Sequence, residues 1–330
     1  MVRCMAEVRI DPLSGLRVIV ASDRAERPGG ELTVAPPAPI DAATDPFAEG
    51  HEDQTPPELY AVRPAGGEPD GPGWMVRAFP NRFPGLTPDA PTPAHDAQPG
   101  LFTALPARGA HEIIVNSPLP VTSLAQLSAA QVAAAVAGWR ERMRAQTGAA
   151  YVHLCVNERL AAGATQPHTH AQLFALDFVP AAVARERERF SAHAVRTMGA
   201  NLLEDLTQEE VRRRDRVVAI DDEAVLTCPY ASRSEFALML APRRRRDRFE
   251  DDGPTGAALL HDALSRLARR FGTSPPLNLW IRTAPRDAER FCWRIDIVPR
   301  LTHDGGLELG TGVQLNTVSP EQAAAELRGS

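Results

Sequence analysis

The chain has 330 residues, of which 43% are hydrophobic and 24% are charged, a composition typical of a folded chain with one large domain or two ordinary ones. No apolar run approaches the roughly 18 residues of a membrane-spanning helix, and charges interrupt the N-terminus before a signal-peptide core could form. The net charge of −6, with arginine supplying all 36 basic residues, argues against nucleic acid as a partner. We therefore expect a cytoplasmic protein that binds neither membrane nor nucleic acid.

The first third of the chain predicts little regular structure. Residues 8–21 predict two short strands around a Pro-Leu-Ser-Gly turn, and an arginine-rich loop follows at residues 22–30. Residues 31–109 are rich in proline and glycine and contain one clear strand pattern, at residues 74–79. We expect most of this segment to be loop that packs on a core formed elsewhere.

Further along, the order strand, helix, strand, strand occurs twice. The first copy comprises strand 111–116, a helix from about Leu124 to Gln146 with Ser123 or Ser128 as N-cap, and strands 151–156 and 168–176. The second comprises strand 235–240, helix 256–271, and strands 277–282 and 292–298, after a charged helical stretch at residues 181–214. These patterns predict an α+β fold of two similar domains with antiparallel sheets, residues 1–180 and 181–330, related by internal duplication.

The cysteines and glycines exclude several classes of site. The four cysteines, Cys4, Cys155, Cys228 and Cys292, are isolated from one another, so neither a Cys-x-x-Cys pair nor a disulfide framework is expected. A Gly-x-Gly-x-x-Gly turn and a regular βαβ alternation are also absent from the sequence. A doubly wound nucleotide-binding sheet is therefore not expected.

The segment GATQPHTHAQ, residues 163–172, contains the most informative pattern. On a strand, His168, His170 and Gln172 share one face, and three polar side chains there would be wasted in a plain core. Two imidazoles could also begin a metal site if other segments supply further ligands, or could lie on a solvent-facing strand. The residues alone leave catalysis, metal binding and simple exposure open.

This segment, with Asn157 ahead of it, resembles the active-site block of the galactose-1-phosphate uridylyltransferases, a transferase branch of the histidine-triad superfamily. The resemblance implies two histidine-triad-like domains, of which the first is catalytic and the second degenerate. Four further segments resemble the same family in the same order: RIDPLSGLRVIVASDRAERP, WMVRAFPNRFPGL, HEIIVNSP and GGLELGTGVQLNTVSPEQAAAELR.

The resemblance implies that a nucleoside monophosphate, UMP in this family, moves between a nucleotide sugar and a sugar 1-phosphate through a covalent intermediate on His170. Gln172 would donate to a phosphoryl oxygen, and because an amide cannot titrate it favours a phosphate acceptor over water. His168 would orient the catalytic loop. The motif also suits an ADP-sugar phosphorylase of the same branch, with inorganic phosphate as acceptor, or a catalytically silent nucleotide-binding module.

Other segments match binding positions of the family. With no lysine in the chain, arginine must hold the phosphates. The resemblance places the hexose at Glu308 and Gln314, commonly across a subunit interface, and so implies a homodimer. It places the nucleotide and phosphates at Arg24, Arg27, Asn81, Asn157 and Thr165. The residues alone would equally fit a solvated arginine loop and three turn-capping side chains.

The zinc site of many relatives is not retained. Asp45 and Ala48 stand where those relatives have two cysteines, and Pro120 stands about where a distant histidine would be. Only His168 remains, and one imidazole cannot make a tetrahedral site.

A second metal site of some relatives also lacks its ligands. Arg294 and Asp296 replace a His-x-His pair, and Glu186 alone keeps its place. His51 and His111 are the remaining candidates, and we expect both to be surface or loop residues. The prediction is a protein without zinc, iron or another cofactor.

Overall fold

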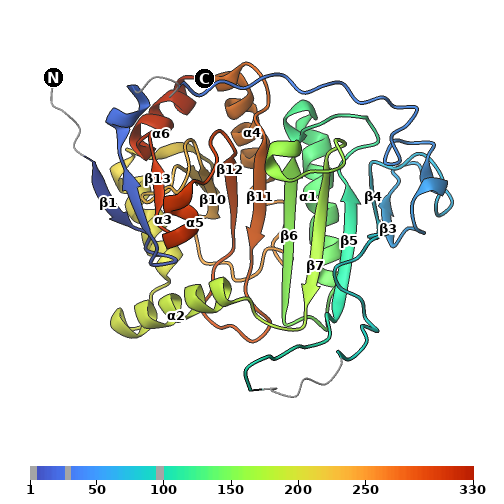
Figure 1. The fold of residues 1–330 in the computed structure, drawn as a ribbon, viewed down its shortest axis with the longest axis horizontal. Coiled ribbons are helices and arrows are strands. Elements are labelled where there is room, and N and C mark those ends of the chain that lie inside the picture. The colour runs from blue at the N-terminus through green and yellow to red at the C-terminus, as the bar shows by residue number, and fades with distance from the viewer. Residues whose placement is uncertain (1–5, 27–30, 94–99) are drawn as a thin grey trace.

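A ten-stranded antiparallel sheet is the frame of the molecule (Figure 1). The computed structural model describes residues 6–26, 31–93 and 100–330. In spatial order the sheet contains β3 (Tyr60–Val62), β4 (Val76–Pro80), β5 (Gly109–Val115), β7 (His170–Leu176), β6 (Tyr151–Glu158), β11 (Leu277–Arg282), β12 (Arg294–Pro299), β10 (Leu238–Pro242), β9 (Ala224–Thr227) and β8 (Val217–Ile220). The α+β class and the antiparallel pairing are confirmed, and the strands of both predicted halves join in one continuous sheet through the β6–β11 pair.

Two helices cover one face of this sheet, α1 (Ala129–Ala145) and α4 (Ala257–Phe271), which Figure 1 shows behind the strands. The expected helix from Leu124 begins five residues later. Both candidate N-caps are used, because Ser123 caps a separate 3₁₀ turn, η3 (Leu124–Gln126), and Ser128 accepts a hydrogen bond from the Gln131 amide. The helices bury apolar side chains against the sheet in the main hydrophobic core.

On the opposite face of the central strands, α2 (Ala181–Arg196) lies where β11 ends and β12 begins, and we call the rest the open face. Along β6, β7 and β11, the residues that face the helices are buried and the alternate residues are half-buried. In β6, for example, Leu154 and Val156 lie in the core, whereas His153, Cys155 and Asn157 lie on the other face. Period two therefore places a row of polar side chains on the face opposite α1 and α4.

The remaining elements surround this frame. The charged stretch contains two helices, α2 (Ala181–Arg196) and α3 (Leu202–Arg213), because Asn201 caps a new helix start. A three-stranded sheet, β1 (Glu7–Ile10), β2 (Arg17–Val20) and β13 (Gln314–Asn316), joins both ends of the chain, with β13 parallel to β2. The other short elements are η1 (Ser22–Glu26), η2 (Glu52–Gln54), η4 (Leu160–Ala162), α5 (Gly306–Thr311) and α6 (Pro320–Gly329).

Several predicted strand starts were wrong by two or three residues: β7 begins at His170, β10 at Leu238 and β12 at Arg294. After residue 30 the chain runs along the upper edge in Figure 1 from the small sheet to β3 at the far end of the large one. Within the described ranges, no helix combines the length and apolar character needed to span a membrane.

Candidate active site

His170, the first residue of β7, is 5% exposed. Its Nδ1 lies 2.7 Å from the main-chain oxygen of His168. A carbonyl oxygen can only accept, so Nδ1 carries the proton and Nε2 keeps its lone pair. Burial lowers the pKa of His170 below its ordinary value, so the ring is neutral at pH 7. A neutral imidazole with a free Nε2 is the form that can attack phosphorus.

His168 lies just before β7, so the prediction that the strand includes His168 was wrong. Its ring connects two distant segments: Nδ1 is 2.6 Å from Asp45 Oδ2, and Nε2 is 2.8 Å from the Ser117 carbonyl oxygen. Burial alone would raise the pKa of the Asp45 carboxyl, but hydrogen bonds from His168 and the Phe47 amide outweigh it and lower that pKa. Asp45 is therefore ionised, and the His168 ring has an acceptor beside each of its two nitrogens.

The loop that contains Asp45 packs against His170. The Phe47 ring meets the His170 ring edge-on, with centroids 5.3 Å apart, and meets Phe79 in the same way at 5.6 Å. Sequence reasoning treated this proline- and glycine-rich segment as loop. The structure adds that the loop forms one wall of the His170 site.

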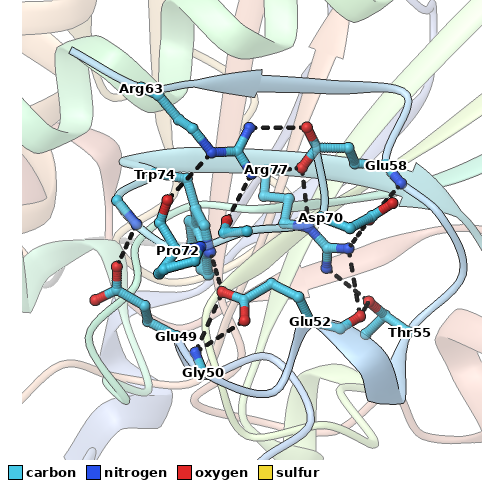
Figure 2. Close-up of polar contacts among 12 residues, drawn as sticks. Glu49, Gly50, Glu52, Thr55, Glu58, Arg63, Asp70, Pro72, Trp74 and Arg77 are labelled. Atoms are coloured by element: carbon cyan, nitrogen blue, oxygen red, sulfur yellow. Dashed lines mark hydrogen bonds and ion pairs between the residues drawn. The ribbon is translucent and has the colours of Figure 1, made fainter. Parts of the chain in front are cut away.

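Figure 2 shows the polar network that holds the far end of this loop. Glu52 accepts hydrogen bonds from the Trp74 indole at 2.7 Å and from the Gly50 amide. Arg77 of β4 is 2% exposed and donates to Asp70 and Thr55, both at 2.6 Å. The loop is thus anchored to β4 by buried charges.

Gln172 follows His170 on the same face of β7, as period two predicts. His111 of β5 accepts the Gly85 amide at Nδ1, so its proton sits on Nε2, which donates to Gln172 Oε1 at 3.1 Å. Burial lowers the pKa of His111 and keeps it neutral. The bond occupies the amide oxygen of Gln172 and leaves its NH₂ group as the free donor.

The expectation that His111 is a surface or loop residue was therefore wrong. It lies half-buried in β5, and its ring stacks on Phe174 with centroids 4.1 Å apart. The residue that fixes Gln172 comes from 61 positions away, and no local pattern in the sequence indicates it. Only the β5–β7 register, which pairs His111 with Phe174, reveals it.

Two predicted asparagines lie near this face. Asn81 Oδ1 accepts the Phe83 amide, the turn-capping role that the residues alone suggested. Its Nδ2 lies 3.1 Å from His111 Nε2, a contact between two donors once Nε2 carries the proton. Asn157 Oδ1 accepts Asn278 Nδ2 of β11 at 2.7 Å. Asn278 is a further polar residue of this face that the sequence did not single out.

Two neighbours of the His170 site, Thr169 and Cys155, do not offer a second nucleophile. Thr169 faces the opposite side, as expected, where its hydroxyl accepts from Asn116 and donates to Glu158. Cys155 of β6 pairs in register with Gln172, and burial raises the pKa of its thiol to about 11. Because a thiol is nucleophilic only as the thiolate, Cys155 does not compete with His170.

Glu308 and Gln314 meet at one cavity. It has a volume of about 180 Å³, and Asn278, Trp280 and Arg300 also line it. Asn278 links this cavity to Asn157, so both places belong to the open face. The carboxylate of Glu308 also accepts the Gly305 amide at the start of α5.

The other predicted binding residues are not brought to this centre. Arg24 in η1 and Thr165 before β7 are both exposed, and neither side chain forms a hydrogen bond or ion pair with another described residue. Arg27 lies outside the described residues. The structure therefore gathers His170, Gln172, Asn81 and Asn157, whereas Arg24 and Thr165 form no hydrogen bond with any of them.

The residues present do not fit the metals of related proteins. Both ring nitrogens of His168 are occupied by Asp45 and Ser117, and Ala48 offers no ligand atom. In the second half, Arg294 donates to both carboxylate oxygens of Glu186 at 3.0 Å and also contacts Asp296. Among the described residues, no group of three or more His, Cys, Asp or Glu side chains is arranged to hold a metal.

Comparisons with known proteins show which family this chain resembles. Residues 2–180 match the family model described as galactose-1-phosphate uridyl transferase, N-terminal domain, and residues 125–328 match a domain of unknown function, DUF4921. An ADP-glucose phosphorylase of Arabidopsis thaliana is 26% identical over 98% of this chain and 92% of its own. A galactose-1-phosphate uridylyltransferase of Haemophilus influenzae is 28% identical over 76% and 75%.

The fold is likewise shared. The crystal structure of an Arabidopsis thaliana ADP-glucose phosphorylase with bound ADP-glucose has a TM-score of 0.81 to this chain, at 24% identity and 99% coverage of both chains. A uridylyltransferase structure has a TM-score of 0.74, at 22% identity and 98% coverage of both. With more than half of its length matched by the family model, the chain belongs to the galactose-1-phosphate uridylyltransferase family of nucleotidyltransferases.

Proposed function

We propose that this protein moves a nucleoside monophosphate between a nucleotide sugar and a second phosphate through a covalent nucleotidyl-His170. Nε2 of His170 attacks the α-phosphorus, the bond from phosphorus to the bridging oxygen breaks, and sugar 1-phosphate leaves. The acceptor phosphate then attacks the same phosphorus and breaks the N–P bond. The observation that carries this proposal is the neutral His170, with Nδ1 tied to the His168 carbonyl and Nε2 free.

Gln172 supports transfer rather than hydrolysis. Its amide oxygen is occupied by His111, so its NH₂ group can donate to a phosphoryl oxygen. Neither partner changes charge near neutral pH, so the pair offers no general base to activate water. We expect Gln172→His to bind the nucleotide sugar but to raise the ratio of hydrolysis to transfer, and an unchanged ratio would refute this role.

We propose UMP as the transferred group and a sugar 1-phosphate as the acceptor, as the names of the uridylyltransferase relatives suggest. A second pair, an ADP-sugar with inorganic phosphate, is favoured by the coverage of the Arabidopsis relative, which matches 98% of this chain. The site residues serve both pairs equally, because His170 and Gln172 contact only the phosphates.

The deciding experiment is to incubate the protein with UDP-, ADP- and GDP-sugars and to read its intact mass. A nucleotidyl adduct should appear with one base, disappear on addition of the correct acceptor, and be lost in His170→Ala. His153→Ala is the matched control, because His153 is another half-buried histidine on the open face of β6. An adduct retained by His170→Ala, or absent with every donor, would refute the proposal.

We infer further that the protein acts as a two-fold homodimer in which Glu308 and Gln314 complete the partner's sugar site. The half-buried polar row on the open face of the sheet supports this inference, since a second copy could cover it. Mixing inactive His170→Ala with inactive Glu308→Ala should restore partial activity when subunits exchange, because one site per mixed dimer carries neither defect. A dimer that exchanges subunits without complementation would place these residues in their own chain's site.

We also infer that domains 1–180 and 181–330 arose by internal duplication. The sheet order supports this inference because it reads symmetrically about the β6–β11 pair: β4-β5-β7-β6 on one side and β11-β12-β10-β9 on the other. Each half also places its helix, α1 or α4, after the second strand of its set in chain order.

A further inference from the structure

The ion pair between Asp45 and His168 is the least accessible polar contact beside the proposed nucleophile. Their side chains are 1% and 0% exposed, and the bond joins residues 123 positions apart in the chain. A buried pair of charges costs desolvation energy, so its presence next to His170 requires an explanation. The residues around the pair do not fit a metal, because both ring nitrogens of His168 already have protein partners.

The protonation of the pair follows from its neighbours. Both ring nitrogens of His168 face acceptors, a carboxylate oxygen and the Ser117 carbonyl. N–H groups on both ring nitrogens would match these two acceptors, and this is the protonation that an ion pair with the Asp45 carboxylate requires. The other oxygen of that carboxylate accepts the Phe47 amide at 3.0 Å, and the main-chain oxygen of Asp45 lies 2.7 Å from His51 Nδ1.

The pair connects directly to the nucleophile in two ways. The main-chain oxygen of His168 is the acceptor that holds Nδ1 of His170, so a fixed His168 fixes which nitrogen of His170 is free. Asp45 also starts the turn that presses the Phe47 ring against the edge of His170. The orientation of His170 therefore depends on both partners of the pair.

We propose that Asp45 is a positioning residue: its ion pair with His168 is a metal-free cross-link that holds the 45–52 loop against β7 and fixes the tautomer and direction of His170. The proposal rests on the proposed role of His170 as nucleophile. No electron transfer or bound ion enters it, and Asp45 does not touch the substrate.

The first test measures ring protonation and is independent of activity. Nitrogen NMR of the histidine-labelled protein, with His168 and His170 assigned by substituting each in turn, should show two N–H groups on His168 and one, at Nδ1, on His170 at neutral pH. In Asp45→Asn, His168 should lose one proton, because a buried cation without its counter-charge is disfavoured. The Nδ1 preference of His170 should then weaken. A singly protonated His168 in the natural protein would overturn the ion pair.

The second test measures adduct formation. Asp45→Asn should lower the rate of nucleotidyl-His170 formation by up to about 100-fold, the cost of a displacement of about 1 Å, with little change in KM. Asp41→Asn is the matched control, since Asp41 is an exposed aspartate just before this loop and its side chain bonds Ala43 and Thr44. It should leave both the rate and the His170 tautomer unchanged.

The outcomes separate this proposal from the one on which it rests. If Asp45→Asn keeps the natural rate and the natural His170 tautomer, and loses only stability, the pair is structural and the positioning role is refuted. If the natural protein forms no adduct with any donor, the proposed nucleotidyl transfer is refuted. The His170 tautomer in Asp45→Asn still decides whether the pair orients that ring.

Discussion

Replacing Glu158 with glutamine should make the protein more stable above neutral pH. Glu158 ends β6 and is 1% exposed, and its carboxyl oxygens accept the Ser123 hydroxyl at 2.5 Å and the Leu124 amide at 2.6 Å. Burial nevertheless raises the pKa of the Glu158 carboxyl from 4.5 to about 7, against the lowering effect of these bonds. The folded protein therefore keeps a proton that the unfolded chain releases.

The sign and size of the effect follow from this difference. Because the pKa of Glu158 is higher in the folded state, its contribution to stability is full below pH 4.5 and is lost as pH rises through about 7. Each pKa unit corresponds to about 1.4 kcal/mol, so the loss approaches about 3 kcal/mol above pH 8. Glutamine resembles the protonated acid and does not titrate, so Glu158→Gln should match the natural protein near pH 4 and exceed it at pH 9.

Urea unfolding of both proteins at pH values from 4 to 9 measures this difference. Glu209→Gln is the control, because Glu209 is exposed on α3 and its bonds from Arg212 and Arg213 lower its carboxyl pKa to about 2. Its effect on stability should not vary between pH 5 and pH 9. If the gap between Glu158→Gln and the natural protein is likewise constant with pH, Glu158 does not titrate in this range and the reasoning is wrong.

Three further predictions concern the site and its support. His111→Phe should keep the stacking on Phe174 but lower the transfer rate about tenfold in steady-state assays, since Gln172 loses the bond that orients it, and an unchanged rate would refute that role. Arg77→Met should lower the free energy of unfolding by about 3 kcal/mol, because the buried bonds in Figure 2 are lost, and a cost within experimental error would show that the loop is held otherwise. Elemental analysis should find zinc and iron below one per chain and activity should survive chelation, whereas one tightly held ion lost together with stability would contradict the metal-free site.

Much of the fold could be predicted because its core strands and helices have strong periodicity. In β6 and β7 alternate apolar residues form one core face, and α1 buries a stripe that includes Val132, Val136 and Trp139. The strands β3, β8 and β9 have three or four residues each, and pairing with their neighbours rather than local preference stabilises them. The break between α2 and α3 contains Met198 and Gly199 at positive φ, a conformation that the sequence did not indicate.

Part of the site could likewise be predicted from local sequence, and part depends on the fold. The spacing of His170 and Gln172 predicts one shared face, because the period of a strand is local information. Their partners His111 and Asp45 come from segments that only the sheet and the folded loop bring near, the latter through the main chain of His168. An isolated histidine in a strand and an isolated aspartate in a proline-rich loop carry no signal of these contacts.

The contacts of the histidines also bear on the kind of group that can leave. His111 is neutral and uses its only N–H on Gln172, and both ring nitrogens of His168 are occupied by Asp45 and a carbonyl oxygen. These side chains can therefore neither protonate a leaving oxygen nor accept a proton from an attacking one. A sugar 1-phosphate needs little protonation to leave, and a phosphate acceptor is already an anion, whereas an alcohol or water would need the missing acid or base. These contacts support the proposed exchange between two phosphates, because none of these side chains supplies the acid or base that hydrolysis would need.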